Sequence, residues 1–253
     1  MRAPVDTIPA PTFPSGPWVN ASGPQSILKQ GKPMLVEFWD FCRPNSMRTL
    51  PYLKAWHERY APEGLRVIGV HCPGFDASRD EQAVRDAVAR VGVEYPVLID
   101  SDLEMWQDYG NEGWPSRYLF DGRARLFEYH YGEGGYAETE LAIQELLGVT
   151  REPLAPLRPE DAAGAVLVPQ TQDQEGPYSG PYEAGGVWAV LDGAGVVTVN
   201  GGASAGGAEV RVTHPGAYPL VEHAQHTAGV LDLRIGPGVD CLATCFTPGV
   251  VGR

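Results

Sequence analysis

The amino-acid sequence predicts an α/β domain followed by an all-β domain, and three observations support this division. Between Met34 and Leu147, apolar strand-like segments alternate with segments of helical periodicity, which is typical of a sheet covered by helices. Residues 151–162 are rich in proline, and beyond them helical periodicity ends while short strand-like runs recur. A chain of 253 residues is long enough for two modest domains.

The first domain follows in order along the chain, with strands predicted at 34–39, 65–71 and 95–100. Helices are predicted at 46–60, after Ser78 through Val91, and at 103–109 and 137–147. Ser78 is expected to cap the second of these helices, with Glu81 three residues later. Gly148 ends the last helix. Residues 116–131 predict a hairpin around Asp121-Gly122. This alternation implies a parallel or mixed sheet with helices on both faces.

The whole chain divides into an arm (1–24), the α/β domain (25–150), a linker (151–162) and the all-β domain (163–253). The arm is rich in proline and is expected to lie over a surface. Six strand-like runs predict the β-domain: VWAVLD, GVVTVN, EVRVTH, AYPLVE, VLDLRI and DCLATCF. Asp192-Gly193 and Asn200-Gly201 are turn signals within it, so we expect a β-sandwich or jelly roll.

Composition excludes several classes of function. The net charge is −13 and no basic stripe is present, which argues against nucleic acid or an anionic membrane as partner. The N-terminus has no apolar run of the kind found in signal peptides or transmembrane helices, so a cytoplasmic location is expected. The four cysteines have neither metal-type spacing nor the density of a disulfide framework. We therefore expect no metal and no cofactor, and in a reducing compartment the four cysteines should be free thiols.

The α/β domain resembles the TlpA/DipZ-type branch of the thioredoxin superfamily, and also the thioredoxin-like module of NHL-repeat-containing proteins. The stretches that carry the resemblance are GKPMLVEFW, RTLPYLKAWHERY, GLRVIGVHCPGF, YPVLIDSD, GWPSRYLF and GEGGYAETE. EVRVTHPGAYPLVEH and VLDLRIGPGVDCLATCFTPG resemble the carbohydrate-module-like β-domain at the C-terminus of DipZ. The resemblance implies a thioredoxin-like fold and thiol–disulfide oxidoreductase ancestry.

In this family a CxxC motif opens the helix after the first FW strand. Aligning FW and RTLPYL without a gap places Arg43 at the first cysteine position and Ser46 at the second, while Cys42 falls one residue early. Dithiol exchange needs one thiolate to attack and a second to resolve the mixed disulfide, which neither residue can supply. By resemblance, Glu37 matches the family's buried acid, with an expected raised pKa, and Trp114-Pro115 matches its cis-proline loop.

Alternatives remain for the thiols. Cys42 is either a lone nucleophile, activated by Arg43 and the nearby helix start, or an idle buried thiol. Cys72 follows the second predicted strand, so a Cys42–Cys72 disulfide is also considered. A metal site that adds His71 lacks a fourth ligand, and His71 is expected to be a strand-end histidine with satisfied hydrogen bonds.

Two sets of aromatic residues also allow two interpretations each. One set either rims the site or packs in the core: Trp39, Phe41, Trp106 and Trp114. The other either forms a sugar-stacking platform or packs in the β-domain core: Tyr178, Tyr182, Trp188 and Tyr218.

Three hypotheses for function follow. The first is a thioredoxin-like module without a dithiol, whose groove around Arg43, Ser46 and Pro115 binds a protein or peptide. The second is a monothiol redox enzyme that uses Cys42 for thiol exchange or reaction with peroxide. The third is a carbohydrate-binding protein that uses the β-domain.

Overall fold

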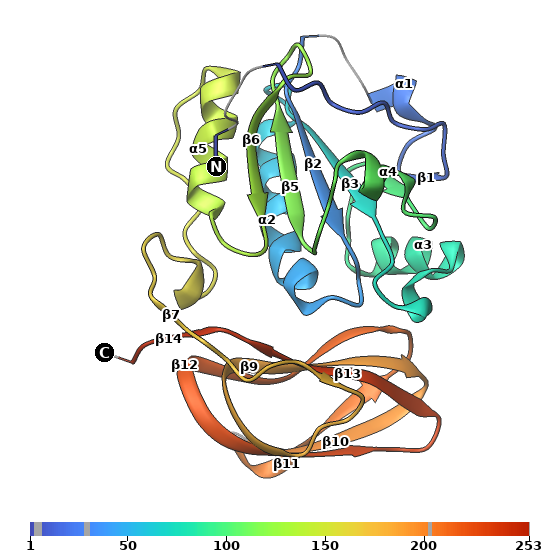
Figure 1. Ribbon diagram of the computed structural model, residues 1–253, viewed down its shortest axis with the longest axis vertical. Coiled ribbons are helices and arrows are strands. Elements are labelled where there is room, and N and C mark those ends of the chain that lie inside the picture. The colour runs from blue at the N-terminus through green and yellow to red at the C-terminus, as the bar shows by residue number, and fades with distance from the viewer. Residues whose placement is uncertain (3–6, 28–30, 202–203, 253) are drawn as a thin grey trace. The chain divides into compact units, whose positions relative to one another are not determined.

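A computed structural model describes residues 1–2, 7–27, 31–201 and 204–252 (Figure 1). The chain divides into two compact units: Met1–Phe41 with Asn45–Leu154 form the first, and Ala155–Arg253 with the short segment Cys42–Pro44 form the second. Among the described residues, no helix is both long enough and apolar enough to span a bilayer.

A six-stranded sheet with the order β1-β4-β3-β2-β5-β6 forms the centre of the first unit. Its strands are β1 (Trp18–Val19), β2 (Met34–Trp39), β3 (Arg66–His71), β4 (Val97–Ile99), β5 (Ser116–Phe120) and β6 (Leu126–Tyr131). β2, β3 and β4 are parallel, while β1, β5 and β6 pair in antiparallel fashion. The predicted mixed sheet and hairpin are therefore present. The carboxyl ends of the three parallel strands lie at one edge, where ligand and active sites commonly form in such sheets.

Helices cover both faces of this sheet (Figure 1). They are α1 (Pro24–Ile27), α2 (Pro44–Tyr60), α3 (Glu81–Arg90), α4 (Glu104–Asp108) and α5 (Tyr136–Leu147), with a 3-10 turn, η1 (Asp76–Ser78). α2 and α5 pack on the same face, because the rings of Tyr52 and Tyr136 stack with centroids 3.8 Å apart. Ile27 of α1 and Met105 of α4 belong to the apolar core of the other face.

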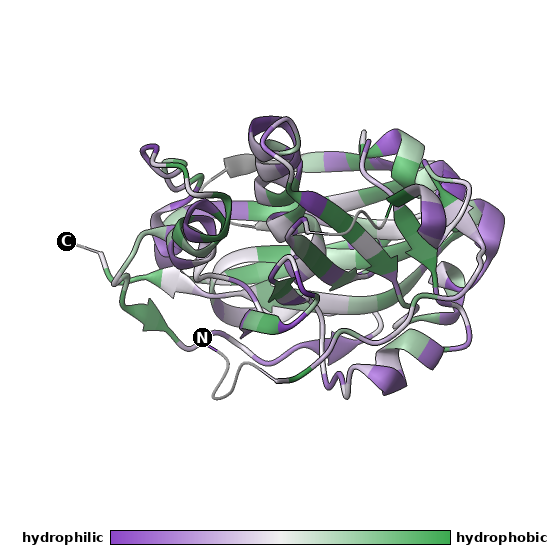
Figure 2. Ribbon diagram, turned by 90° about the horizontal axis from the view of Figure 1, so that it is seen from above, coloured by the Kyte–Doolittle hydropathy of each residue, from purple (hydrophilic) through white to green (hydrophobic). Residues whose placement is uncertain are grey.

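Burial explains the strand pattern of the first unit. All six residues of β2 are buried, and alternation sends Val36 and Phe38 into the core beneath α1 and α4. Leu35, Glu37 and Trp39 therefore point to the face covered by α2 and α5. In Figure 2 the strands carry most of the green, hydrophobic residues, whereas purple residues are frequent on helices and loops.

The start of α3 differs from the sequence prediction. Asp80, not Ser78, is its N-cap, and the Asp80 carboxylate accepts a hydrogen bond from the backbone N of Ala83 at 2.9 Å. Ser78 is buried in η1, where its hydroxyl donates to the carbonyl of Phe75 at 3.0 Å. Both residues are good caps, and the extended backbone at Asp80 decides between them.

The described part of the proline-rich arm is integrated into the first unit. β1 pairs with β4, and Pro9 forms a β-bridge with Arg125 next to β6. Phe13 and Trp18 are buried in the core. The arm therefore supplies core residues as well as surface cover.

The second unit is built from strands. A six-stranded antiparallel sheet has the order β11-β10-β12-β9-β13-β8, and β14 pairs with β7. The bounds are β7 (Leu167–Val168), β8 (Gln174–Glu175), β9 (Gly180–Gly193), β10 (Gly195–Gly201), β11 (Ser204–Val212), β12 (Gly216–Ile235), β13 (Val239–Thr247) and β14 (Gly249–Val250), preceded by the 3-10 turn η2 (Pro159–Asp161). The prediction of an all-β unit is confirmed.

One detail of the β-domain prediction is wrong. AYPLVE and VLDLRI were expected to be separate strands, but both lie in β12. The pairing of β12 with β9 shifts register between Glu222 and Thr227, so the two runs are joined across an irregularity within one strand. The core of this unit includes Val187, Leu191 and Phe246.

Candidate functional site

The candidate site starts where α2 begins, directly after the loop that follows β2. Arg43 precedes the first helical residue, Pro44, and Ser46 lies in the first turn. The Ser46 side chain is buried, and its hydroxyl accepts a hydrogen bond from the backbone N of Asp40 at 3.2 Å. The Ser46 hydroxyl therefore fixes the loop between β2 and α2.

A buried carboxylate and a buried histidine lie at the ends of β2 and β3. Asp40 Oδ1 is 3.5 Å from His71 Nε2, and both side chains have no exposed surface. The other oxygen, Asp40 Oδ2, accepts a hydrogen bond from the backbone N of Gly74 at 2.8 Å. The rings of Phe41 and Trp39 enclose the imidazole, each with its centroid 5.2 Å away. The expectation that His71 is satisfied is wrong, because neither ring nitrogen has a hydrogen-bond partner among the described residues.

Cys72 is held by a second aspartate, which follows β4. Its thiol donates to Asp100 Oδ2 at 3.3 Å. Asp100 also accepts hydrogen bonds from the backbone N of Met105 and of Trp106, at 3.2 and 2.9 Å. Burial and the Asp100 carboxylate raise the pKa of Cys72 well above its ordinary value, so this thiol stays protonated. The Cys42–Cys72 disulfide is not formed: both residues are thiols.

Glu37 lies two residues before Trp39 in β2, and its side chain is on the same face of the sheet, which α2 covers. It is opposite Gly69 of β3 and Arg117 of β5 in the strand register. Burial raises the pKa of Glu37 to about 7, and the positive charge of Arg117 opposes part of this rise. Neither carboxyl oxygen has a hydrogen-bond partner among the described residues. Glu37 is therefore a buried acid that titrates near neutral pH.

The Trp114–Pro115 peptide bond is cis, and it leads directly into β5. The Trp114 indole donates to the carbonyl of Cys72 at 3.0 Å, which fixes the ring beside the end of β3. The rings of Trp106 and Trp114 lie 4.3 Å apart, and both side chains are partly exposed. These two rings rim the site, whereas Trp39 and Phe41 are buried core residues.

Cys42 is fully buried. In the part of the chain that the structure describes, no three His, Cys, Asp or Glu side chains are arranged to hold a metal ion. The carboxyl ends of β2, β3 and β4 therefore hold a buried polar cluster with an aromatic rim. Asp40 and Asp100 accept hydrogen bonds there, whereas the His71 ring has no hydrogen-bond partner among the described residues.

Sequence reasoning missed Asp40, Asp100 and Arg117. Asp40 directly follows one predicted strand and Asp100 is the last residue of another, and such positions meet at one edge of a parallel sheet. That signal was available in the sequence. The position of Arg117 opposite Glu37 required the register between β2 and β5, which no local pattern provides.

The fold and this site define the first unit as a thioredoxin-like domain without a CxxC motif. No family model matches the chain. The chain is 32% identical over 163 residues to Protein DipZ of Mycobacterium bovis, a match that covers 61% of this chain and 24% of DipZ. It is 25% identical over 133 residues to the thiol-disulfide oxidoreductase YkuV of Bacillus subtilis, covering 53% of this chain and 89% of YkuV.

NHL repeat-containing protein 2 of Homo sapiens is 31% identical over 128 residues, which cover 49% of this chain and 18% of that protein. A solved structure of a thiol-disulfide isomerase from Corynebacterium glutamicum superposes with a TM-score of 0.50 at 24% identity, covering 58% of this chain and 100% of the other. The predicted resemblance is confirmed: the chain is similar in sequence to DipZ and to YkuV, and its first unit has a thioredoxin-like fold. It spans about a quarter of the length of DipZ.

Proposed function

We propose that the first unit is a peptide-binding thioredoxin-like module in which a fixed polar cluster has replaced dithiol exchange. The observation that carries the proposal is the structure at the two motif positions. Arg43 stands at the first, and at the second the Ser46 hydroxyl accepts a hydrogen bond from the backbone of Asp40. Exchange requires an attacking and a resolving thiolate, and these positions provide neither.

The neighbouring thiols do not replace the missing pair. Cys72 donates its proton to Asp100 in a hydrogen bond, and its raised pKa keeps it protonated. Cys42 is fully buried, which disfavours the alternative of a monothiol enzyme because reactive thiols need access to their substrate.

The aromatic rim supports peptide binding. Trp106 and Trp114 offer partly exposed rings of fixed orientation next to Pro115, at the edge where β5 begins. Rigid aromatic rings bury a large apolar area at low entropic cost, which suits them as anchors for an extended segment. A protein or peptide partner at this groove is the part of the family's activity that survives without sulfur chemistry.

The carbohydrate alternative has less support. Tyr182 lies in the core of the second unit, with Tyr178 and Tyr218 packed against it. The hydroxyl of Tyr178 donates to the carbonyl of Pro181 at 2.7 Å, and that of Tyr218 donates to the carbonyl of His214 at 2.8 Å. Rings and hydroxyls used internally form no open stacking platform.

An insulin-reduction assay tests the loss of dithiol chemistry. We expect no activity from the wild-type chain and a gain of activity in the Arg43→Cys/Ser46→Cys double variant, because the start of α2 stabilises a thiolate at its first turn. The matched Arg43→Ala/Ser46→Ala variant should stay inactive. Wild-type reduction of insulin that disappears in Cys42→Ser would instead establish the monothiol enzyme.

Selection from a displayed library of random peptides tests the binding role. The folded chain should enrich a peptide family, and Trp114→Ala should weaken binding of the selected peptides about tenfold, as loss of an aromatic anchor does. Leu141→Ala, at an exposed apolar position on α5, is the control and should bind normally. Enriched peptides that bind Trp114→Ala as well as wild type would contradict the proposed groove.

A further inference from the structure

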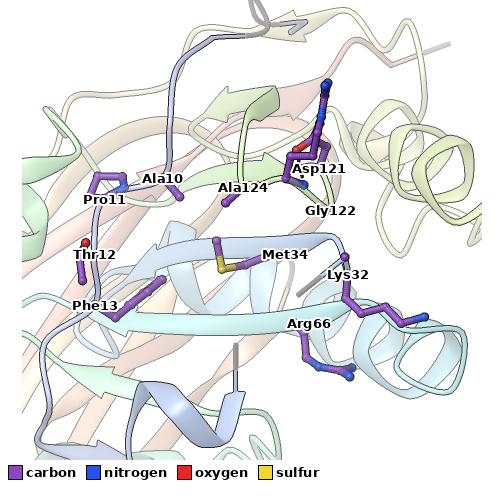
Figure 3. A pocket seen from close by; sticks show the side chains of 12 residues that line it. Ala10, Pro11, Thr12, Phe13, Lys32, Met34, Arg66, Asp121, Gly122 and Ala124 are labelled. Atoms are coloured by element: carbon purple, nitrogen blue, oxygen red, sulfur yellow. Dashed lines mark hydrogen bonds and ion pairs between the residues drawn. The ribbon is translucent and has the colours of Figure 1, made fainter. Parts of the chain in front are cut away.

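A second hollow lies at the opposite end of the same sheet, at the amino ends of β2 and β3. It is a cavity of about 590 Å³ beneath residues 10–13 of the arm and beside the loop between β5 and β6 (Figure 3). Ligand pockets in proteins commonly have volumes of this order. The site described above uses the carboxyl ends of β2 and β3, so the two regions are separated by the length of these strands.

One end of the cavity is apolar. Its walls there include Pro11, Phe13, Met34 and Ala124, and Phe13 and Met34 belong to the core of the first unit. The arm is fixed above this end, because the backbone N of Ala10 donates to the carbonyl of Ala124 at 2.9 Å. The apolar end is therefore preformed.

Backbone alone forms part of the remaining wall. The backbone N of Gly31 donates to the carbonyl of Gly122 at 3.2 Å. A Cβ atom on Gly122 would lie 2.8 Å from the carbonyl oxygen of Gly31. The two backbone segments therefore approach as closely as glycine permits.

The other end of the cavity is cationic. Lys32 precedes β2 and Arg66 begins β3, and in Figure 3 both side chains extend away from Phe13 and Met34. Within the described residues neither has a carboxylate partner: Arg66 donates to the carbonyl of Leu65 at 3.1 Å. Arg123, also in the lining, is paired with Asp121 at 3.3 Å. Two uncompensated cations stand out in a chain of net charge −13.

We propose that this cavity binds a small amphipathic carboxylate, with its apolar chain between Phe13 and Met34 and its carboxylate at Lys32 and Arg66. The apolar chain gains from removal of its surface from water. The carboxylate is attracted by the two positive charges, which have no carboxylate partner among the described residues. It can stay partly hydrated at the mouth of the cavity. The proposal does not depend on peptide binding at the other end of the sheet.

Isothermal titration of the full chain with decanoate tests the proposal, with decanol and butyrate as comparison ligands. Decanoate should bind, decanol should bind more weakly because it lacks the charge, and butyrate more weakly because it buries little apolar surface. High salt should weaken decanoate binding. Equal affinity for decanoate and decanol, or no binding of decanoate, would overturn the proposal.

Variants locate the site. Lys32→Ala/Arg66→Ala should weaken decanoate binding about tenfold, the combined factor expected of two ion pairs near a surface. Lys54→Ala is the matched control, because Lys54 lies on α2 and donates to the carbonyl of Val91 instead. Backbone NMR shifts on decanoate addition should be largest around Gly122 and Met34. Unchanged affinity in the double variant, or shifts confined to other regions, would contradict the assigned site.

Discussion

Two buried glutamates in the first unit show opposite solutions to the same problem. Glu140 of α5 and Glu37 of β2 each have a side chain that is about 1% exposed. Glu140 accepts hydrogen bonds from Trp56 Nε1, Arg59 Nη1, Tyr60 Oη and the backbone N of Leu154, at 3.2, 2.8, 2.7 and 2.8 Å. Glu37 accepts none from the described residues. Burial of a carboxylate is tolerated where donors replace water, and otherwise the group retains its proton.

The difference follows from which element supplies the donors. Glu140 lies where α5 packs on the end of α2, so helix side chains and the chain after α5 converge on it. Glu37 lies in the middle of a sheet, opposite Arg117. Arg117 Nε donates to Thr139 Oγ1 at 3.0 Å and Nη2 donates to the carbonyl of Gly134. The guanidinium therefore acts on Glu37 through its charge and not through a hydrogen bond.

Removing Glu140 should have the largest effect on stability. Glu140→Ala leaves four donors without their acceptor, and we expect the free energy of unfolding of the first unit to fall by about 4 kcal/mol. Urea unfolding measures this change. Glu145→Gln, on an exposed residue of the same helix, is the control and should change stability by less than about 0.5 kcal/mol. A cost for Glu140→Ala as small as that of the control would remove the contrast between the two glutamates.

Glu37→Gln should remove a pH dependence of stability. The pKa of Glu37 is about 7 in the folded chain and 4.5 in an ordinary glutamate. Between these values the unfolded chain releases the proton and the folded chain keeps it. The free energy of unfolding therefore falls as pH rises, by about 3 kcal/mol in total, and the loss is complete above the folded pKa.

Urea unfolding of wild type and Glu37→Gln across this range provides the measurement. Relative to wild type, the variant should gain about 3 kcal/mol between about pH 4.5 and about pH 8. Parallel pH profiles for the two proteins would show that Glu37 ionises in the folded chain much as it does in water.

The smallest change in the free energy of unfolding is expected for a pair of tyrosines, which also gives the most closely matched comparison. Both Tyr60 and Tyr95 are fully buried. The Tyr60 hydroxyl donates to Glu140 and accepts from Gln144 Nε2 at 3.0 Å, while the Tyr95 hydroxyl, near Glu37, has no hydrogen-bond partner among the described residues. Tyr60→Phe should cost about 1.5 kcal/mol and Tyr95→Phe less than about 0.5 kcal/mol, measured by urea unfolding. Equal costs would contradict the distinction between satisfied and unsatisfied sites.

Much of the fold of the first unit was predictable, because apolar periodicity and β-branched runs mark its strands and helices directly. Elements that depend on distant partners were not. The two-residue strand β1 forms only because β4 offers an edge to Trp18 and Val19. In β12 one strand continues across the irregularity between Glu222 and Thr227, where the local pattern suggested two.

The candidate site likewise has some features that local sequence predicts and others that depend on distant partners. The motif alignment located Arg43 and Ser46 from neighbouring residues alone, and Glu37 was expected to have a raised pKa. The contact between Asp40 and His71 joins residues on different strands, so it required the parallel pairing of β2 with β3. Local sequence therefore identified Arg43 and Ser46 at the start of α2, whereas the sheet register determines what surrounds them.

The N-terminal segment borders both margins of the first unit's sheet. Trp18 and Val19 pair along β4, while Arg2 and Pro9 form bridges to Glu128 and Arg125 at the far margin. A bare outer strand is a template for pairing with another chain, and very short or covered margins prevent such growth. The segment that composition marks only as a proline-rich arm therefore covers both margins. We expect a chain that begins at residue 25 to associate more readily, because it lacks this cover on both sides at once.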